Sequence, residues 1–320
     1  MQINSPKADK VIYLLIIGVG EHNNNKKMIN RMNDYFVRYL FGSIGNEDIL
    51  ENIVNSVLKD SGFEEVHNLE ILNPHNLSEN INLKESILDV KAITKDNKKI
   101  IIEIQLSGNI DFVKRIHYYI SKNIVSEVSK NEEYKIINHI ISINLLNFNL
   151  DFGDNGKPHR CFKLIDTEDI NVSLDMIQMH ILEIPRFINI LNNSSIDDIK
   201  KNKILSWIDF FTAKDFNDDE KDKLKEANNI MSKVIDKYER FISSKEEMEV
   251  YNARDAFLYG QTVMLEYERE EGKKEGIEIG FKQGIEKGIE KGIEKEKYSL
   301  AKNMKKENMD INLISRLTGL

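Results

Sequence analysis

The chain has 320 residues, a formal net charge of −8 and a single cysteine, Cys161. This length accommodates one large domain, or one domain with a substantial appendage. The acidic balance excludes a global attraction to nucleic acid or anionic lipid, so binding to a polyanion would need a local patch or metal ions. A lone cysteine cannot form an intrachain disulfide, which favours a location in the reducing cytoplasm.

Residues 1–27 are expected to form an N-terminal extension, whose most apolar run is VIYLLIIGVG at 11–20. A run of about ten residues is too short to span a bilayer, which needs roughly 20. A weak signal or anchor is an alternative because two lysines precede the run, although no small-residue cleavage site follows it. A translation start at Met28 or Met32 is another alternative. We expect no membrane partner.

The first core elements are predicted to be two helices and a strand. NDYFVRYLFG (33–42) is typical of a short helix with Asn33 as its N-cap. Asp34 lies in its first turn, where a negative charge suits the helix dipole. NEDILENIVNSVLKDSG (46–62) has one apolar stripe at helical spacing. EEVHNLEIL (64–72) predicts a strand.

A β-hairpin with an acid in each arm is predicted over 86–105, SILDVKAITKDNKKIIIEIQ. Two apolar runs flank the polar KDNKK, which is the pattern of two strands and a turn. Asp89 lies in the first arm and Glu103 in the second, and Gln105 shares the face of Glu103 because side chains alternate along a strand. The IIIEIQ run is otherwise apolar on both faces. It therefore predicts a central strand, where an unpaired carboxylate is rare.

The register of this hairpin decides whether Asp89 meets Glu103. If Thr94 faces Lys98 across a three-residue loop, Asp89 falls opposite Glu103. A loop of two or four residues would put the two acids on opposite faces. Opposed carboxylates repel each other unless a cation lies between them, and such an oxygen pair suits Mg²⁺ or Mn²⁺. The alternative is that both acids lie on a solvated strand face beside lysines.

The remaining core elements indicate an α/β fold. NIDFVKRIHYYISKNIVSEVSK (109–130) has helical spacing of its apolar residues, and KIINHIISINLLNF (135–148) is apolar enough for a strand buried on both faces. A helix between strands implies that the later strand pairs in parallel with an earlier one. Two more strands are predicted near 160–166 and 179–184.

From residue 196 onward the pattern becomes helical. Trp207 lies on an apolar face, and a further helix is predicted at about 218–241. Glycines then recur every four residues from Gly272 to Gly292, among Glu–Lys pairs. Each glycine costs about 1 kcal/mol relative to alanine inside a helix. Two alternatives follow: a long, marginal, exposed helix or self-associating arm, or a partly disordered charged tail.

The ordered set of motifs resembles the Rpn group of recombination-promoting nucleases and transposases, in the PD-(D/E)xK nuclease superfamily. The matching stretches, in chain order, are NDYFVRYLFG, ILDVKA, IIIEIQ, DFVKRIHYYISK, HIISINLLNF, HILEIPRF and WIDFF. The resemblance covers about residue 28 to the C-terminus. It implies a restriction-endonuclease-like α/β core, with a mixed sheet flanked by helices, an α-helical C-terminal region and a long charged helical tail.

The Asp–spacer–Glu–x–Gln arrangement resembles the active site of that superfamily. By this resemblance Asp89 and Glu103 would bind the divalent metal. Gln105 would stand where the superfamily's lysine orients and helps to activate the attacking water, but it cannot supply a positive charge. More of the transition-state stabilisation would therefore fall on the metal.

Three further residues receive roles from the resemblance. Asp34 would complete or support the metal site. The alternative is that it serves only the helix dipole. Arg115 and Tyr119, one turn apart on a helix, would contact a phosphate or shape the site. The alternatives are that Arg115 pairs with a nearby acid and that Tyr119 belongs to the core.

We expect four regions: the extension at 1–27, a nuclease-like core at 28–195, a helical region at 196–268 and the glycine-periodic tail at 269–320. The implied function is a metal-dependent DNA endonuclease linked to recombination or a mobile element, with Mg²⁺ (or Mn²⁺) as cofactor and DNA as partner. The alternative is a non-catalytic DNA-binding or self-assembling protein that keeps the fold. It draws on Gln105, on the excess of acids in the core and on the tail, through which a homo-oligomer would form.

Overall fold

The computed structural model of the chain describes residues 29–75, 90–106, 112–125, 138–150, 152, 156–214 and 216–320. The predicted extension at 1–27 lies outside these residues. The elements, in chain order, are α2 (Asp34–Gly42), α3 (Glu47–Asp60), β1 (Glu70–Ile71), β2 (Val90–Ile93), β3 (Lys99–Gln105), α4 (Phe112–Val125), β4 (Ile140–Leu146), β5 (His159–Ile165), β6 (Ser173–Glu183), α5 (Ile184–Leu191), α6 (Ile196–Lys201), α7 (Lys203–Thr212), α8 (Asp218–Ala227), α9 (Met231–Ser243), α10 (Lys245–Lys306) and α11 (Ile311–Thr318). The chain forms two compact units, Met1–Asn252 and Ala253–Leu320, and the boundary between them falls within α10.

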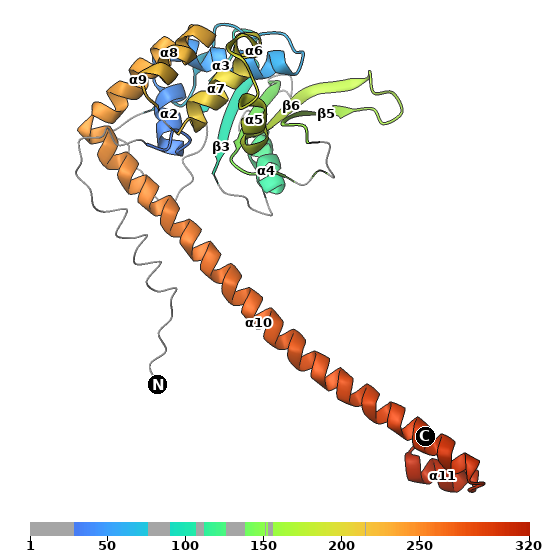
Figure 1. Cartoon of the computed structure of the whole chain (residues 1–320). Helices are drawn as coiled ribbons and strands as arrows, with labels where there is room; N and C mark the ends of the chain where they lie inside the picture. The colour runs from blue at the N-terminus through green and yellow to red at the C-terminus, as the bar shows by residue number, and fades with distance from the viewer. Residues whose placement is uncertain are drawn as a thin grey trace, which may run out of the picture. The chain divides into compact units, whose positions relative to one another are not determined.

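A mixed sheet of six strands lies in the described part of the first unit, in the order β1-β2-β3-β4-β6-β5 (Figure 1). The strands β1, β2 and β3 pair antiparallel, whereas β3, β4 and β6 run parallel, and β5 returns antiparallel to β6. The helix α4 lies between β3 and β4 in the chain, as a parallel pair requires. The predicted α/β fold is confirmed, and β3 is a central strand.

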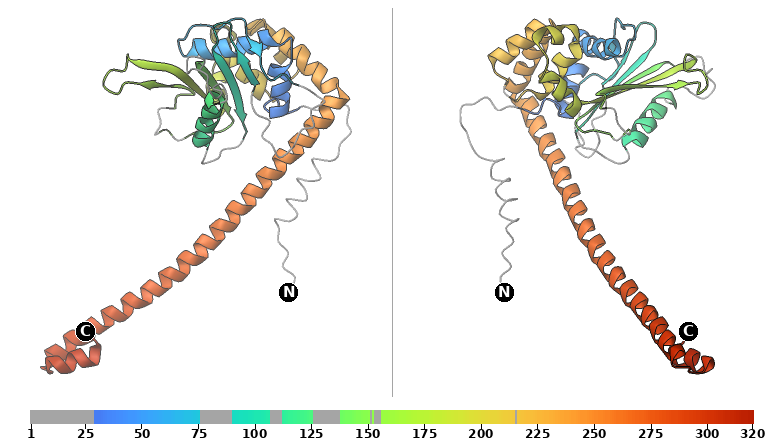
Figure 2. Two further views of the ribbon diagram at one scale, coloured as in Figure 1. Left: turned by 180° about the vertical axis from the view of Figure 1, so that it is seen from behind. Right: turned by 45° about the vertical axis from the view of Figure 1, so that its right-hand side comes forward.

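The larger core covers one face of the sheet. Ile100 and Ile102 of β3 and Ile141 and Ile143 of β4 are buried there with residues of α2, α3 and α7, including Trp207. Burying one such aliphatic side chain contributes about 1.5–3 kcal/mol. Figure 2 shows this helical layer on one side of the sheet and α4 on the other.

The smaller core lies on the opposite face, under α4. Ile101 of β3 and Ile140 of β4 pack there with Phe112, Ile116 and Ile120 of α4. Successive side chains of a strand point to opposite faces. Glu103 and Gln105 follow Ile101 at intervals of two. They therefore lie on the face that α4 covers.

Two local predictions differ from the structure for identifiable reasons. The strand predicted at 64–72 is reduced to Glu70–Ile71, because the side chain of Asn55 binds the backbone N–H and C=O of Val66 at 2.8 and 2.9 Å in place of a neighbouring strand. The single helix predicted at 218–241 is two helices. Asn228 has extended backbone angles between them, and its side chain bonds to Asn52 and Ser206.

The glycine-periodic segment is helical throughout. It belongs to α10, a continuous helix of 62 residues, and α11 follows it and ends at Gly319 with a left-handed φ of 65°. Of the two alternatives for the tail, the helical arm is therefore the one observed. None of the helices in the described part combines the length and the hydropathy that a membrane span requires.

Candidate active site

The hairpin turn has the three-residue form on which the predicted site depends. Thr94 faces Lys98, and its N–H donates to the Lys98 carbonyl at 2.9 Å. Asn97, the last loop residue, has a left-handed φ of 62°, which asparagine tolerates better than most residues and which suits a three-residue hairpin loop. The ladder then continues without a shift to Val90 paired with Ile102.

The next pair along this register would join positions 89 and 103. Asp89 itself lies outside the described residues, so its place opposite Glu103 stays a prediction. The register that the prediction requires is nevertheless the one observed from Thr94 back to Val90. A two- or four-residue loop, which would have separated the two acids, is excluded.

Glu103, Gln105 and Arg115 lie together on the face of the sheet that α4 covers. One guanidinium nitrogen of Arg115, Nη2, lies 3.5 Å from Glu103 Oε1 and donates a hydrogen bond to Gln105 Oε1. Arg115 is at the end of the first turn of α4, whose apolar residues Phe112 and Ile116 dock on the sheet. The alternative that Arg115 pairs with a nearby acid is therefore realised, and the acid is Glu103.

The carboxylate of Glu103 is buried and incompletely bonded. The residue is 5% exposed, and Oε1 has no hydrogen-bond partner among the described residues, since the 3.5 Å approach of Arg115 is an ion pair too long for a good hydrogen bond. Burial raises the pKa of the Glu103 carboxyl, and the Arg115 guanidinium opposes that shift. A buried acceptor of this kind normally has a partner.

This carboxylate suits a hard cation. Carboxylate oxygens are the ligands that Mg²⁺ and Mn²⁺ prefer, and a cation would satisfy the unpaired oxygen. Within the described ranges, no cluster of three or more His, Cys, Asp or Glu side chains could hold a metal ion. Any such site at Glu103 would therefore need ligands of another kind, or Asp89.

The roles predicted for Asp34 and Tyr119 stay predictions. Asp34 lies in the first turn of α2, where its carboxylate accepts a hydrogen bond from Tyr35 N at 2.9 Å. Tyr119 is half-buried on α4, one turn beyond Arg115, and its ring packs edge-on against Tyr118 at 5.5 Å. Nothing observed assigns either side chain to a metal or a phosphate.

Sequence analysis did not single out Asn144, which the structure places beside Glu103. These two residues are register partners in the parallel pair of β3 and β4. Asn144 is fully buried, in a strand whose other polar residue is Ser142. The signal was present in IISINLL, because a buried amide in an otherwise largely apolar strand poses the same question as the acid in IIIEIQ.

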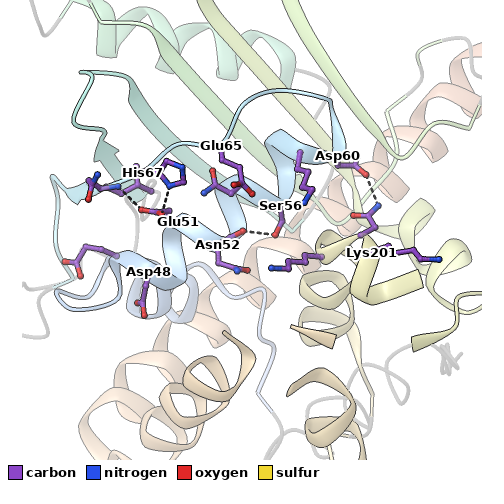
Figure 3. A pocket seen from close by; sticks show the side chains of 15 residues that line it. Asp48, Glu51, Asn52, Ser56, Asp60, Glu65, His67 and Lys201 are labelled. Carbon is purple, nitrogen blue, oxygen red and sulfur yellow. Dashed lines mark hydrogen bonds and ion pairs between the residues drawn. The ribbon is translucent and has the colours of Figure 1, made fainter. Parts of the chain in front are cut away.

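A separate polar cavity of about 920 Å³ lies along α3 and contains none of the predicted site residues (Figure 3). Glu51 accepts the backbone N–H of Asn68 there at 2.9 Å and lies 3.2 Å from His67 Nδ1. Asp60 and Lys201 line its other end. The walls mix acids and lysines, so the cavity has no single-sign field to attract a polyanion.

The family of the chain follows from a comparison with known proteins. The sequence profile described as PD-(D/E)XK nuclease family transposase matches residues 31–268. The chain belongs to this family. Comparisons with curated proteins and with solved structures gave no significant match.

Membership of the PD-(D/E)XK nuclease family transposases agrees with the mixed sheet and with the resemblance found in the sequence. It indicates a nuclease-type function, and it implies a DNA substrate. Nucleases of this kind generally use divalent metals. The matched range contains Glu103, Gln105 and Arg115.

Proposed function

We propose that this protein is a metal-dependent DNA endonuclease that hydrolyses phosphodiester bonds in DNA recombination or in the movement of a mobile element. The observation that carries the proposal is the buried carboxylate of Glu103 on a central strand, whose Oε1 has no hydrogen-bond partner among the described residues and which lies beside Gln105 and Arg115. A purely structural carboxylate in such a place would be fully paired. Family membership supplies the class of reaction.

Glu103 and Asp89 are the proposed ligands of Mg²⁺ or Mn²⁺. The hairpin register supports this pair because it points to position 89 as the partner of Glu103. A divalent cation at such a site polarises a phosphate oxygen and lowers the pKa of water. Asp34 is a further proposed acid at the site.

Gln105 and Arg115 together would replace the superfamily's lysine. The amide of Gln105 can orient water but carries no charge. Arg115 holds the Gln105 amide oxygen and brings a permanent positive charge to the same place. The Arg115 guanidinium could also contact a phosphate oxygen, and Tyr119, one turn further along α4, is the proposed second contact with DNA.

The proposed setting is the cytoplasm, because the only cysteine, Cys161, is free. A second candidate function is a self-assembling protein that keeps the nuclease fold. It is favoured by the exposed isoleucines of α10, Ile285, Ile289 and Ile293, which are 46%, 58% and 52% exposed beside glycines. Isolated exposed apolar residues need no explanation, but a regular row of them marks an interaction surface.

Cleavage of supercoiled plasmid tests the proposed function. Wild-type protein should nick the plasmid with Mg²⁺ or Mn²⁺ and stop when EDTA is added. Glu103→Gln and Asp89→Asn should each lower the rate by about 100-fold or more, the size seen when one charge-stabilising group is lost. Glu70→Gln, an exposed acid of β1, is the matched control and should cut normally. Full activity in both site variants would refute the proposal.

A further inference from the structure

Asn144 shares its position in the sheet with Glu103. The two residues are Cα partners across β3 and β4, and residues paired in this way lie on the same face. That face is the one under α4, because Ile140 and Leu146, which flank Asn144 at intervals of four and two, belong to the core that α4 covers. Neighbouring strands lie about 4.8 Å apart, so the two side chains rise side by side.

The orientation of the Asn144 amide is fixed by its nitrogen. Nδ2 donates to Ser142 Oγ at 3.1 Å and to the backbone carbonyl of His180 at 3.0 Å. Because a carbonyl oxygen can only accept, the nitrogen must lie on that side. The amide oxygen Oδ1 therefore lies on the other side, where it is buried and has no hydrogen-bond partner among the described residues.

Two buried oxygens without donors thus stand on one face of adjacent strands, Glu103 Oε1 and Asn144 Oδ1. Each is destabilising by itself, since a buried acceptor loses its water without a replacement. Two acceptors cannot satisfy each other, and an ionised Glu103 has no proton to share. A hard cation would satisfy both at once, because carboxylate and amide carbonyl oxygens are both ligands for Mg²⁺ and Mn²⁺.

We infer that Asn144 is a ligand of the proposed cation site and contributes its carbonyl oxygen beside Glu103. This inference rests on the proposed metal-dependent function and adds to it an uncharged ligand from β4. The hydrogen bonds that Nδ2 donates to Ser142 and His180 hold the amide in an orientation suited to binding, as supporting contacts do in metal sites. The ligand set would then draw on two neighbouring strands, β3 and β4.

Binding of Mn²⁺ to the full chain without DNA, measured by calorimetry and by electron paramagnetic resonance of the free ion, tests the inference. Asn144→Leu, which keeps the size of the side chain, should weaken Mn²⁺ binding by about 10-fold or more. The melting temperature of the metal-free protein is measured in parallel, because the substitution removes an unpaired acceptor but also the two hydrogen bonds that Nδ2 donates to Ser142 and His180. Asn144→Asp should bind Mn²⁺ more tightly than wild type and should gain more thermal stability when Mn²⁺ is added.

Gln178→Met is the matched control. Gln178 is also a buried amide of this sheet whose oxygen has no partner in the part of the chain that the structure describes, but it neighbours Ile141 and so faces the opposite core. Its replacement should leave Mn²⁺ affinity unchanged. Folded Asn144→Leu and Asn144→Asp proteins that both bind Mn²⁺ as wild type does would overturn the inference.

Glu103→Gln separates this failure from a failure of the proposed function. If Glu103→Gln loses Mn²⁺ binding while the Asn144 variants keep it, the cation site exists and Asn144 is not part of it. If wild-type protein binds no Mn²⁺ at all, the metal-dependent function and the role of Asn144 fall together.

Discussion

At the scale of single residues, burial and a neighbouring positive charge have opposite effects on the Glu103 carboxylate. Its carboxylate is buried, which disfavours the charged form, and Arg115 is the nearby positive charge that opposes this effect. The same guanidinium holds Gln105. In the metal-free protein, Arg115 therefore supplies part of the positive charge that a cation would place beside Glu103.

Replacing Arg115 should separate metal binding from catalysis. Arg115→Gln removes a positive charge beside Glu103, so we expect Mn²⁺ affinity to be unchanged or higher, because like charges repel. Plasmid cleavage should fall about 10- to 100-fold, since the charge that compensates for Gln105 is lost. Calorimetry and nicking rates measure the two effects.

Lys122→Gln, which removes a charge from an exposed position of α4, is the control for Arg115→Gln and should affect neither quantity. Two results would contradict the role of Arg115. One is a cleavage rate equal to that of wild type, and the other is a loss of Mn²⁺ affinity in step with activity.

At the scale of elements, one turn sets the geometry of the hairpin. The left-handed Asn97 closes a three-residue loop, and the loop length alone decides which side chains of β2 share a face with Glu103. A second polar link joins α3 to β5 and to the start of α7. Asp60, at the end of α3, lies 2.6 Å from His159 Nδ1 and accepts Asn202 Nδ2 at 2.8 Å.

This link predicts a pH-dependent contribution to stability. Burial raises the pKa of Asp60, but hydrogen bonds from His159 and Asn202 outweigh it and hold the pKa below its usual range. An acid with a depressed pKa stabilises the fold above its ordinary pKa of about 3.9 and loses that contribution as the pH falls through the folded value.

Asp60→Asn should therefore destabilise the protein by about 1 kcal/mol near pH 7, a modest value because the carboxylate is partly exposed. The difference from wild type should shrink towards zero as the pH falls through the lowered folded-state pKa of Asp60. Urea denaturation across this range measures it. Asp222→Asn, an exposed acid paired with Lys225, serves as the reference. A difference that stays constant from neutral to acid pH would rule out the ionic origin.

At the scale of the whole molecule, the chain separates a unit with a packed core from a unit that is mostly one exposed helix. The glycines of α10 leave open space where a Cβ would lie, so packing within the chain does not require them. The apolar residues beside them repeat every four positions, which exceeds the 3.6-residue turn and makes the row wind around the helix.

Adding charge to this row tests self-association through the tail. In sedimentation velocity, the double variant Ile285→Lys with Ile289→Lys should shift the full-length protein from oligomer towards monomer. Its core should unfold at an unchanged temperature, because the first unit has a hydrophobic core of its own. Glu286→Gln with Glu290→Gln changes the net charge by the same +2, one position further along the helix, and is the control for charge alone. A wild-type protein that sediments as a monomer would remove the second candidate function.

The sequence by itself determined the elements with strong patterns and the identity of the family. Periodicity of 3.6 or 2 is a local property, so α2, α3, the hairpin and β4 could be predicted from it, together with Glu103 and Gln105 as polar residues in an apolar strand. Short elements with weak local signals, such as β1 and the break at Asn228, were not predicted correctly, because contacts with distant residues decide them.

Only the tertiary structure decided which side chains meet. It brought Arg115 to Glu103 and Gln105 across a helix–sheet interface, and it set Asn144 beside Glu103 through the register of two parallel strands. Register and docking depend on the whole core, because shifting a strand by one residue reverses every side chain. Hence the sequence supplied the chemical groups of the candidate site, and packing assembled the described ones.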